Sequence, residues 1–431
     1  MVEAFSFGNF LSFKDIHTLR MFAEPSVDVL EAHTFKAGDA KLLKTKAIYG
    51  ANASGKSVVL RAMVAFLRIV ESSVKDNKIL PMILNPFKLS TKTLKEPSFF
   101  QLIFWMEGTQ YRYGFEVNRE KVISEWLFAN YEGKMAQLFT RKEMKIKINN
   151  QHFEEGKKLK RLLNEGDSLF RANSLLLTSL AYFGFGKLSS KIVDMIGSIT
   201  VINGAYIDEN HYKMAAIGLE DVHQKKFILN ILKKSDIGIK GIEKIRVTRE
   251  HLSEDTDEQF KKNFEEGDLI LSKREQFNED GEVVNSVPFL FDEREESGGT
   301  IKMFEFSSYF YNALEQGKTL FIDELDARLH PLLTKQIIGL FNSKENSKGA
   351  QLVFVTHDTN LLSPELLRRD QIDFVEKDKY GASHLYSLVE IKDVDNNSPF
   401  ESDYIRGRYG AVPFLGDFSL LLDELNDGRK K

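Results

Sequence analysis

Residues 50–57 carry the pattern with the clearest chemical meaning in this sequence. They read Gly-Ala-Asn-Ala-Ser-Gly-Lys-Ser, between an apolar run and a helical pattern, as a phosphate-binding (Walker A) loop does. In such a loop, backbone N–H groups surround phosphate oxygens, Lys56 contacts the β- and γ-phosphates, and the Ser57 hydroxyl binds Mg²⁺. A glycine turn that matches by chance is the alternative, and the flanking patterns argue against it. The predicted nucleotide-binding residues are Gly50, Asn52, Ser54, Gly55, Lys56 and Ser57.

Two adjacent carboxylates end the apolar run at residues 320–324, Leu-Phe-Ile-Asp-Glu. Carboxylates at the end of a buried strand are costly unless a cation lies beside them. We expect Asp323 to hold the Mg²⁺ shell and Glu324 to orient and polarise the attacking water. Alone, the run fits a solvated acidic turn equally well, and the phosphate loop favours the catalytic interpretation.

Two further polar stretches suit contacts with phosphate. Glu296-Ser297-Gly298-Gly299-Thr300 precedes a helical pattern and offers a hydroxyl, free N–H groups and a helix dipole. Since one nucleotide needs only one phosphate loop per chain, we expect this second loop to grip the γ-phosphate bound by another subunit. His357 follows the next strand, where it can hydrogen-bond the γ-phosphate and sense its loss. A helix cap and a structural histidine are the alternatives.

The elements that position these residues follow from hydrophobic periodicity. Strand–helix alternation implies a parallel sheet, so we predict an α/β fold with mixed and parallel sheets and a largely helical insertion. The predicted parts are an N-terminal lobe (1–132), an insertion with a hairpin (133–285) and a C-terminal lobe (286–431). Strands are predicted at 2–13, 44–49, 98–131, 268–277, 282–290, 319–322, 351–356, 371–376 and 384–389, and helices at 55–74, 156–183, 210–235, 300–316 and from Pro331.

Composition excludes several classes of protein. The chain has 431 residues and no cysteine, which excludes disulfides, cysteine-ligated zinc and a catalytic thiol. The formal net charge is −4, which gives no reason to expect a dedicated nucleic-acid binder, although a local basic groove stays possible. The start does not resemble a signal peptide, and no apolar run is long enough for a membrane span. We therefore expect a cytoplasmic protein with no membrane partner.

In their order, these motifs resemble those of ABC-type P-loop ATPases, in the branch that includes SMC, RecF and OLD-like proteins. The resemblance covers roughly residues 1–130 and 290–415. Compact bacterial members of this branch are the ATPase subunits of anti-phage systems such as PARIS and Septu and of RloB-linked operons. Further segments that carry the resemblance are Asn9-Phe10-Leu11-Ser12-Phe13 and residues 324–331, 351–358, 374–378 and 408–415.

The resemblance implies a two-lobed head that dimerises around two ATP molecules, with ATP and Mg²⁺ as cofactors. By position, Glu324 would be the catalytic carboxylate, Asp323 would support the metal and His357 would be the switch. Ser297 and Gly299 would act across the interface, and Asp326 would couple the two sites.

The family's glutamine lid has no clear counterpart in this sequence. Gln101 lies in a strand pattern, and Gln137 follows the three strands expected at 98–131. The stretch that begins with Glu296 and ends with Thr300 also departs from the transporter signature, which makes transport an unfavourable interpretation.

Three functions fit these observations. The leading one is an ATPase that works as a homodimer or a multiple of dimers and controls a separate effector, a nuclease or toxin, in anti-phage defence. The chain lacks heptads, and only 74 residues follow His357, which leaves no room for a nuclease domain of ordinary size. The second is a RecF-like DNA-repair ATPase that uses basic residues at 141–147 and 157–161. The third is a nucleotide-gated interaction module with slow turnover.

Overall fold

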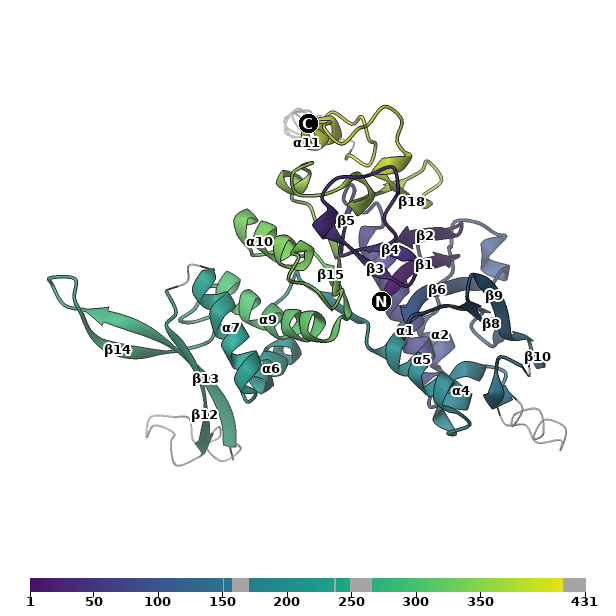
Figure 1. Ribbon diagram of the computed structural model, residues 1–431, viewed down its shortest axis with the longest axis horizontal. Helices are drawn as coiled ribbons and strands as arrows, with labels where there is room; N and C mark the ends of the chain where they lie inside the picture. The colour runs from purple at the N-terminus through teal and green to yellow at the C-terminus, as the bar shows by residue number, and fades with distance from the viewer. Residues whose placement is uncertain (150, 157–169, 236–237, 249–265, 414–431) are drawn as a thin grey trace, which may run out of the picture.

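The computed structural model describes residues 1–149, 151–156, 170–235, 238–248 and 266–413 (Figure 1). A seven-stranded antiparallel sheet has the order β10-β9-β8-β7-β6-β1-β2. A six-stranded sheet has the order β11-β15-β16-β5-β17-β18, in which every pair is parallel except β17–β18. The first sheet comprises β1 (Val2–Gly8), β2 (His17–Arg20), β6 (Ser98–Met106), β7 (Thr109–Val117), β8 (Val122–Tyr131), β9 (Lys134–Lys142) and β10 (Lys145–Ile148). The second comprises β5 (Thr45–Tyr49), β11 (Thr200–Asn203), β15 (Thr319–Asp323), β16 (Gln351–Val355), β17 (Ile372–Lys377) and β18 (Ser383–Ser387).

Helix α1 (Lys56–Ser72) packs within the core that the two sheets share. Its apolar positions Val59, Met63 and Phe66 recur every three or four residues, and all three are fully buried. One hydrophobic cluster contains these residues together with side chains of both sheets. The same cluster takes in the short helix α2 (Ile79–Ile83), α4 (Leu176–Tyr182) and α5 (Lys187–Gly197). The start of α1 is therefore fixed beside the strand ends that carry the polar motifs.

The opposite face of the six-stranded sheet packs on a second set of helices. Side chains alternate along β5, so Ile48 belongs to the first cluster while Ala47 and Tyr49 belong to the second. The covering helices are α6 (Glu209–Gly218), α7 (Val222–Lys234), α9 (Gly298–Gln316) and α10 (Pro331–Asn342). Gly317 ends α9 in the left-handed conformation (φ 63°), and Pro331 begins α10, both as predicted. Helix α11 (Phe400–Ile405) also packs in this second cluster, through Phe400 and Tyr404. The strands β3 (Thr34–Ala37) and β4 (Ala40–Leu43) form a separate two-stranded sheet.

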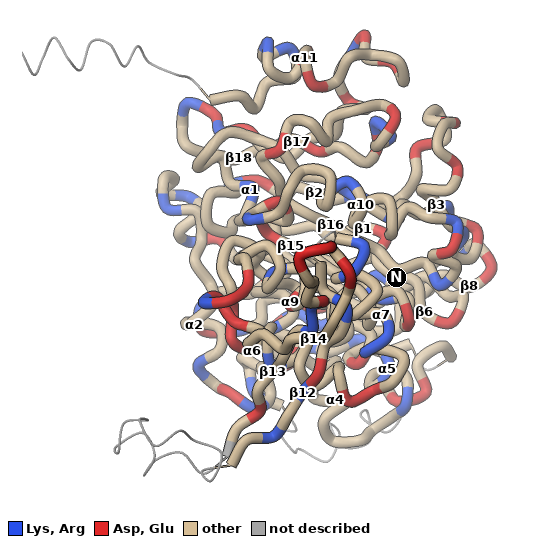
Figure 2. Tube along the Cα trace, turned by 90° about the vertical axis from the view of Figure 1, so that its left-hand side faces the viewer, with Lys and Arg blue, Asp and Glu red and all other residues tan. Residues whose placement is uncertain are grey.

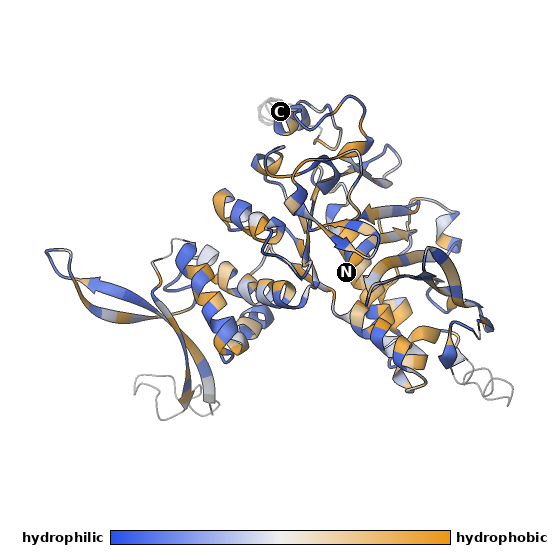
Figure 3. Ribbon diagram, viewed as in Figure 1, coloured by the Kyte–Doolittle hydropathy of each residue, from blue (hydrophilic) through white to orange (hydrophobic). Residues whose placement is uncertain are grey.

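A three-stranded sheet projects from the body of the protein (Figure 1). It consists of β12 (Gly241–Thr248), β13 (Glu266–Phe277) and β14 (Val283–Leu290), and we call it the arm. The β13–β14 hairpin turns at Asp280-Gly281, as predicted. Figure 3 shows hydrophilic and hydrophobic residues mixed along it. Because β14 pairs with one strand only, its other edge is open in the described structure.

The stretch at 133–285 contains more strand than the sequence predicts. The turn of the β8–β9 hairpin lies at residues 132–133, so the predicted boundary there falls inside a continuous sheet. β11 pairs with β15, and the helix predicted at 210–235 is divided into α6 and α7, with Asp221 capping α7. The helix predicted at 156–183 lies partly outside the described residues, and α4 begins at Leu176 after turns. The division into three parts therefore stays a prediction.

Most other predicted elements are confirmed within one or two residues, including the helix after the phosphate loop and the strands around the acidic pair. Among the described residues, no helix is long and apolar enough to cross a membrane.

Candidate nucleotide-binding site

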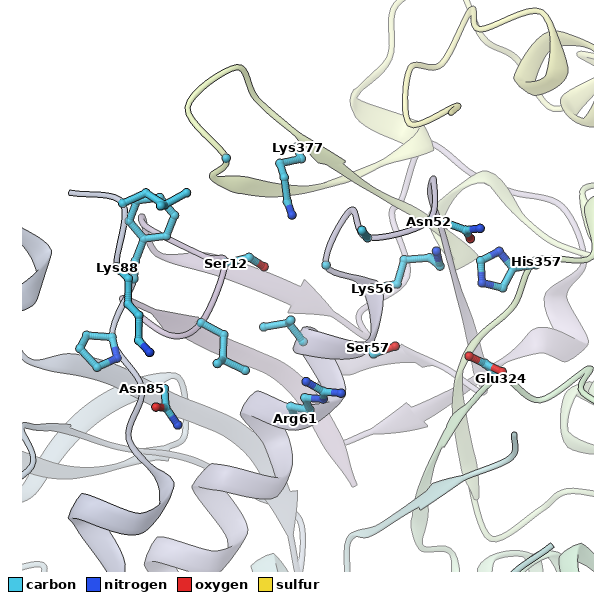
Figure 4. Close-up of a pocket in the computed structure, with 18 residues that line it drawn as sticks. Ser12, Asn52, Lys56, Ser57, Arg61, Asn85, Lys88, Glu324, His357 and Lys377 are labelled. Carbon is cyan, nitrogen blue, oxygen red and sulfur yellow. The ribbon is translucent and has the colours of Figure 1, made fainter. Parts of the chain in front are cut away.

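A cavity of about 590 Å³ lies at the start of α1, against the ends of β5, β15 and β16 (Figure 4). This is the edge where open α/β sheets bind ligands. Lys56, Ser57, Glu324 and His357 gather on one side of it, and Lys88 and Asn85 lie on the other. Among the predicted site residues, those that line the cavity are Asn52, Gly55, Lys56, Ser57, Glu324 and His357.

Two glycines let the phosphate loop pack against β17 and β18. Gly50 and Gly55 have φ of 152° and 113°, which side chains disfavour. A Cβ atom on Gly50 would lie 2.3 Å from the carbonyl oxygen of Val375, and one on Gly55 would lie 2.4 Å from Oγ of Ser383. The predicted need for glycine therefore has a steric cause inside the chain as well as in phosphate binding.

The Lys56 amine closes the loop. Its Nζ donates hydrogen bonds to the carbonyl oxygens of Gly50 (2.8 Å) and Ala51 (2.9 Å). Burial lowers the pKa of Lys56 to about 8, although the carboxylates of Asp323 and Glu324 act in the opposite direction. The amine is thus held inside the loop, where a phosphate group could replace the two carbonyl contacts.

Ser57 and Asp323 meet at the base of the cavity. The Ser57 hydroxyl donates a 3.1 Å hydrogen bond to Oδ1 of Asp323. Burial raises the pKa of Asp323, and the Ser57 hydrogen bond and the cations Arg61 and Lys56 oppose that shift. Within the described ranges, no group of three or more His, Asp or Glu side chains forms a metal site. Two adjacent oxygen donors fit Mg²⁺, which is usually bound by one or two protein groups together with phosphates and water.

Glu324 and His357 approach the cavity from the ends of neighbouring strands. Glu324 has φ of 55°, an uncommon conformation for this residue type. Gly204 passes so close that a Cβ there would lie 2.4 Å from the Glu324 carbonyl oxygen. Burial, and then the charge of Lys56, lower the pKa of His357, which favours the neutral imidazole. The arrangement offers a carboxylate and a neutral imidazole on the same side of the cavity as Lys56.

Asp326 lies beside this pair without lining the cavity. Its Oδ2 accepts a 3.4 Å hydrogen bond from the backbone N–H of His357, which ties it to the strand end that carries the histidine. Its Oδ1 is buried, and among the described residues it has no hydrogen-bond partner. Buried carboxylate oxygens without partners are uncommon in folded proteins.

The Ser-Gly-Gly stretch begins α9 as a capped helix. Ser297 is the N-cap, and its Oγ accepts a 3.1 Å hydrogen bond from the N–H of Thr300. A Cβ on Gly299 would lie 2.9 Å from the Arg328 carbonyl oxygen, and one on Gly298 would lie 3.1 Å from Nη1 of Arg328. Ser297, Gly298 and Gly299 do not line the cavity that holds Lys56. In one chain, the two predicted anion-binding loops are therefore separate.

Several residues at the cavity were not predicted from the sequence. Arg61 lies one helical turn after Ser57, so its spacing of four could have indicated it. Lys88 and Lys377 come from distant segments, and no local pattern marks them. Gln101 does not line the cavity. Its Oε1 instead accepts a hydrogen bond from the Trp126 indole N–H (3.1 Å). Ser12 and Asn85 also line the cavity. Gln137, like Gln101, does not line it.

Comparison with known proteins gives a family and a set of structural likenesses. A family model described as "AAA domain, putative AbiEii toxin, Type IV TA system" matches residues 47–178 and 197–363, more than half of the chain. No curated protein matches the chain significantly.

Three solved structures of SMC heads are similar to this chain at low identity. An SMC head bound to the C-winged helix domain of ScpA is 14% identical, with a TM-score of 0.39 over 90% of this chain and 97% of that one. The SMC head domain from Thermotoga maritima is 13% identical, with a TM-score of 0.40 over 90% and 98%. An SMC head with an extended coiled coil, bound to the C-terminal domain of ScpA derived from Pyrococcus furiosus, is 16% identical, with a TM-score of 0.39 over 90% and 96%.

The family model spans the phosphate loop, the acidic strand end and His357, which are the residues that the fold assembles at the cavity. The chain therefore belongs to this AAA-domain family.

Proposed function

We propose that this protein hydrolyses ATP with Mg²⁺ at composite sites that form when two copies pair. The main support is that the two predicted anion-binding loops are separate in one chain. Lys56, Glu324 and His357 line one cavity, and Ser297 and Gly299 of the same chain do not line it. A second copy supplies the missing loop in this proposal.

The chain's own residues define the reaction. Lys56 and the backbone of the loop bind the β- and γ-phosphates, and Ser57 and Asp323 would hold Mg²⁺, which neutralises charge on the phosphates. Glu324 accepts a hydrogen bond from water and then its proton, as the water oxygen bonds to the γ-phosphorus. The bond from that phosphorus to the β,γ-bridging oxygen breaks, and ADP and inorganic phosphate result. Neutral His357 donates to a γ-phosphate oxygen.

We further propose that the paired state controls a separate effector protein in anti-phage defence. The motif resemblance supports this role, and the family description, which names a toxin of a toxin–antitoxin system, agrees with action alongside a second protein. A nuclease or a toxin is the kind of effector expected.

DNA binding as the principal function has less support. Arg141, one of the basic residues at 141–147, is only 2% exposed, and its guanidinium donates to Glu125 and to the Ser174 carbonyl oxygen. It is a core residue and cannot contact a phosphate backbone, whereas Lys142, Lys145 and Lys147 of the same stretch are exposed. Residues 157–161 lie outside the described ranges. Figure 2 shows Lys and Arg interspersed with Asp and Glu over the face in view, without a basic stripe.

The test is a measurement of mass and ATP turnover with and without MgATP, for the parent, Lys56→Ala and Glu324→Gln. We expect Glu324→Gln to lock an ATP-dependent dimer or larger assembly and Lys56→Ala to abolish it. A parent chain that neither hydrolyses ATP nor changes mass would refute the composite site. Turnover without an assembly would instead favour a single-chain ATPase. For the slow interaction module, Glu324→Gln should barely change the lifetime of the ATP-bound state.

A further inference from the structure

The first residue of the Ser-Gly-Gly stretch is attached to the arm. Glu296 directly precedes the N-cap Ser297, and its side chain is 1% exposed. Its Oε1 accepts a 2.6 Å hydrogen bond from the Ser272 hydroxyl, and its Oε2 forms a 2.6 Å ion pair with Nη2 of Arg274. Both partners belong to β13. A carboxylate buried this completely depends on its partners, so the arm determines where Glu296 lies.

Backbone hydrogen bonds and ring packing also fix the segment between β14 and α9. Phe291 donates its N–H to the carbonyl oxygen of Ile270 (2.9 Å), and its ring packs edge-on against Phe304 of α9 at a centroid distance of 5.0 Å. Glu296 donates its own N–H to the carbonyl oxygen of Asp292 (2.8 Å). Residues 291–296 therefore connect β14 to α9 through fixed contacts, and a shift of β13 would move the start of α9.

The far end of the arm is exposed and apolar. Phe277, Val283 and Val284 are each more than half exposed at the tip of the β13–β14 hairpin. Arg274 and Phe277 belong to one continuous strand, about 10 Å apart along it. A molecule bound at the tip would therefore contact the same strand that carries Arg274.

We propose that Arg274 and Ser272 are positioning residues for the Ser297–Gly299 loop, so that the arm regulates how one copy grips the γ-phosphate on its partner. This regulation rests on the proposed function. The positioning itself does not, because it is a property of the single chain.

The opposing explanation is an ordinary structural ion pair. The arm provides a matched control, since Lys273 follows Ser272 and precedes Arg274 on β13 but forms its ion pair (2.6 Å) with Glu243 of β12. The double variant Arg274→Met/Glu296→Gln provides a second control, because it removes the buried charge as well as its partner.

The first readout is amide hydrogen exchange of residues 293–300 in the full chain without nucleotide. We expect Arg274→Met to raise exchange at 297–300 by at least tenfold, with no change for Lys273→Met. Equal exchange in Arg274→Met and the parent overturns the proposal, whatever the protein does with ATP.

The second readout is ATP turnover and ATP-dependent mass, beside the single-chain affinity for MgATP. For the double variant we expect a parental melting temperature and affinity within about twofold, but turnover and assembly at least tenfold lower. If the double variant regains parental turnover together with its stability, the pair is only structural and the proposal fails. A parent chain inactive in both assays, with exchange raised in Arg274→Met, refutes the proposed function and leaves the positioning supported.

Discussion

The Ser57 hydroxyl donates a 3.1 Å hydrogen bond to Oδ1 of Asp323, and this contact joins the first turn of α1 to the end of β15. The two residues are 266 positions apart in the sequence. This hydrogen bond holds the end of the phosphate loop against the acidic end of β15. It is also where two hard oxygen donors adjoin, as Mg²⁺ requires.

Replacement of Asp323 by Asn tests this point. The amide keeps the size of the side chain but loses its charge, so nucleotide binding should persist while turnover falls by roughly 100-fold and the Mg²⁺ requirement rises. Turnover measured across a Mg²⁺ titration checks this. Asp395→Asn is the control, because Asp395 belongs to an exposed turn and does not line the cavity. Unchanged turnover and Mg²⁺ dependence in Asp323→Asn would remove Asp323 from the proposed metal site.

The lowered pKa of Lys56 predicts how affinity depends on pH. In the free protein this pKa is about 8, and bound phosphate, being anionic, raises it. Below pH 8 the amine is already charged, so affinity for MgATP should vary little. Above it, binding requires the uptake of one proton, so affinity should fall as pH rises, by up to about tenfold per pH unit.

Titrations between about pH 7.5 and 9 check this prediction, with Lys56→Arg as the comparison because a guanidinium stays charged throughout. Parallel curves for the parent and Lys56→Arg would show that another group controls the pH dependence.

The two glycines of the Ser-Gly-Gly stretch should respond differently to alanine. A Cβ on Gly299 would lie 2.9 Å from a backbone oxygen of Arg328, which cannot move alone, so Gly299→Ala should destabilise the fold by about 1–3 kcal/mol. On Gly298 the Cβ would meet the end of the Arg328 side chain, which can swing away, and alanine suits a helix better than glycine. Melting curves should show a lower midpoint for Gly299→Ala alone. Equal midpoints would contradict the close packing.

The parts of the site that could be predicted from the sequence are those with local patterns. Lys56 and Ser57 belong to one loop, and Asp323 and Glu324 end one strand, so spacing alone indicates both groups. The Gly-Gly pair before a helix could be predicted for the same reason, because its residues are adjacent in the sequence. The fold class also followed, because strand–helix alternation constrains a parallel sheet.

Contacts between distant segments could not be predicted in this way. The partner of β15 at the sheet edge is β11, which a sequence pattern does not reveal, and Gly204 beyond it presses on Glu324. Arg141 has a residue type that is usually exposed, but it is buried beside Glu125, so the sequence could not show that it is unable to join a basic patch. Pairings of this kind depend on tertiary packing, which overrides local propensity.

The remaining prediction concerns the cations on the outer wall of the cavity. Figure 4 shows Lys377 directed into the cavity from β17. Its side chain is exposed, so its attraction to a bound triphosphate should be modest, about 0.5–1 kcal/mol, and screened by salt. Lys377→Gln should therefore weaken MgATP affinity two- to fivefold at low salt, less at high salt, and leave saturated turnover unchanged.

The matched control is Lys379→Gln, two residues further on and not part of the cavity lining. Equal losses in both variants would mean that the general positive charge of this loop, and not the placement of Lys377, attracts the nucleotide. A fall in saturated turnover for Lys377→Gln would instead mean that Lys377 acts on the reacting phosphate, since a residue that only helps to bind the ground state changes affinity without changing the rate at saturation.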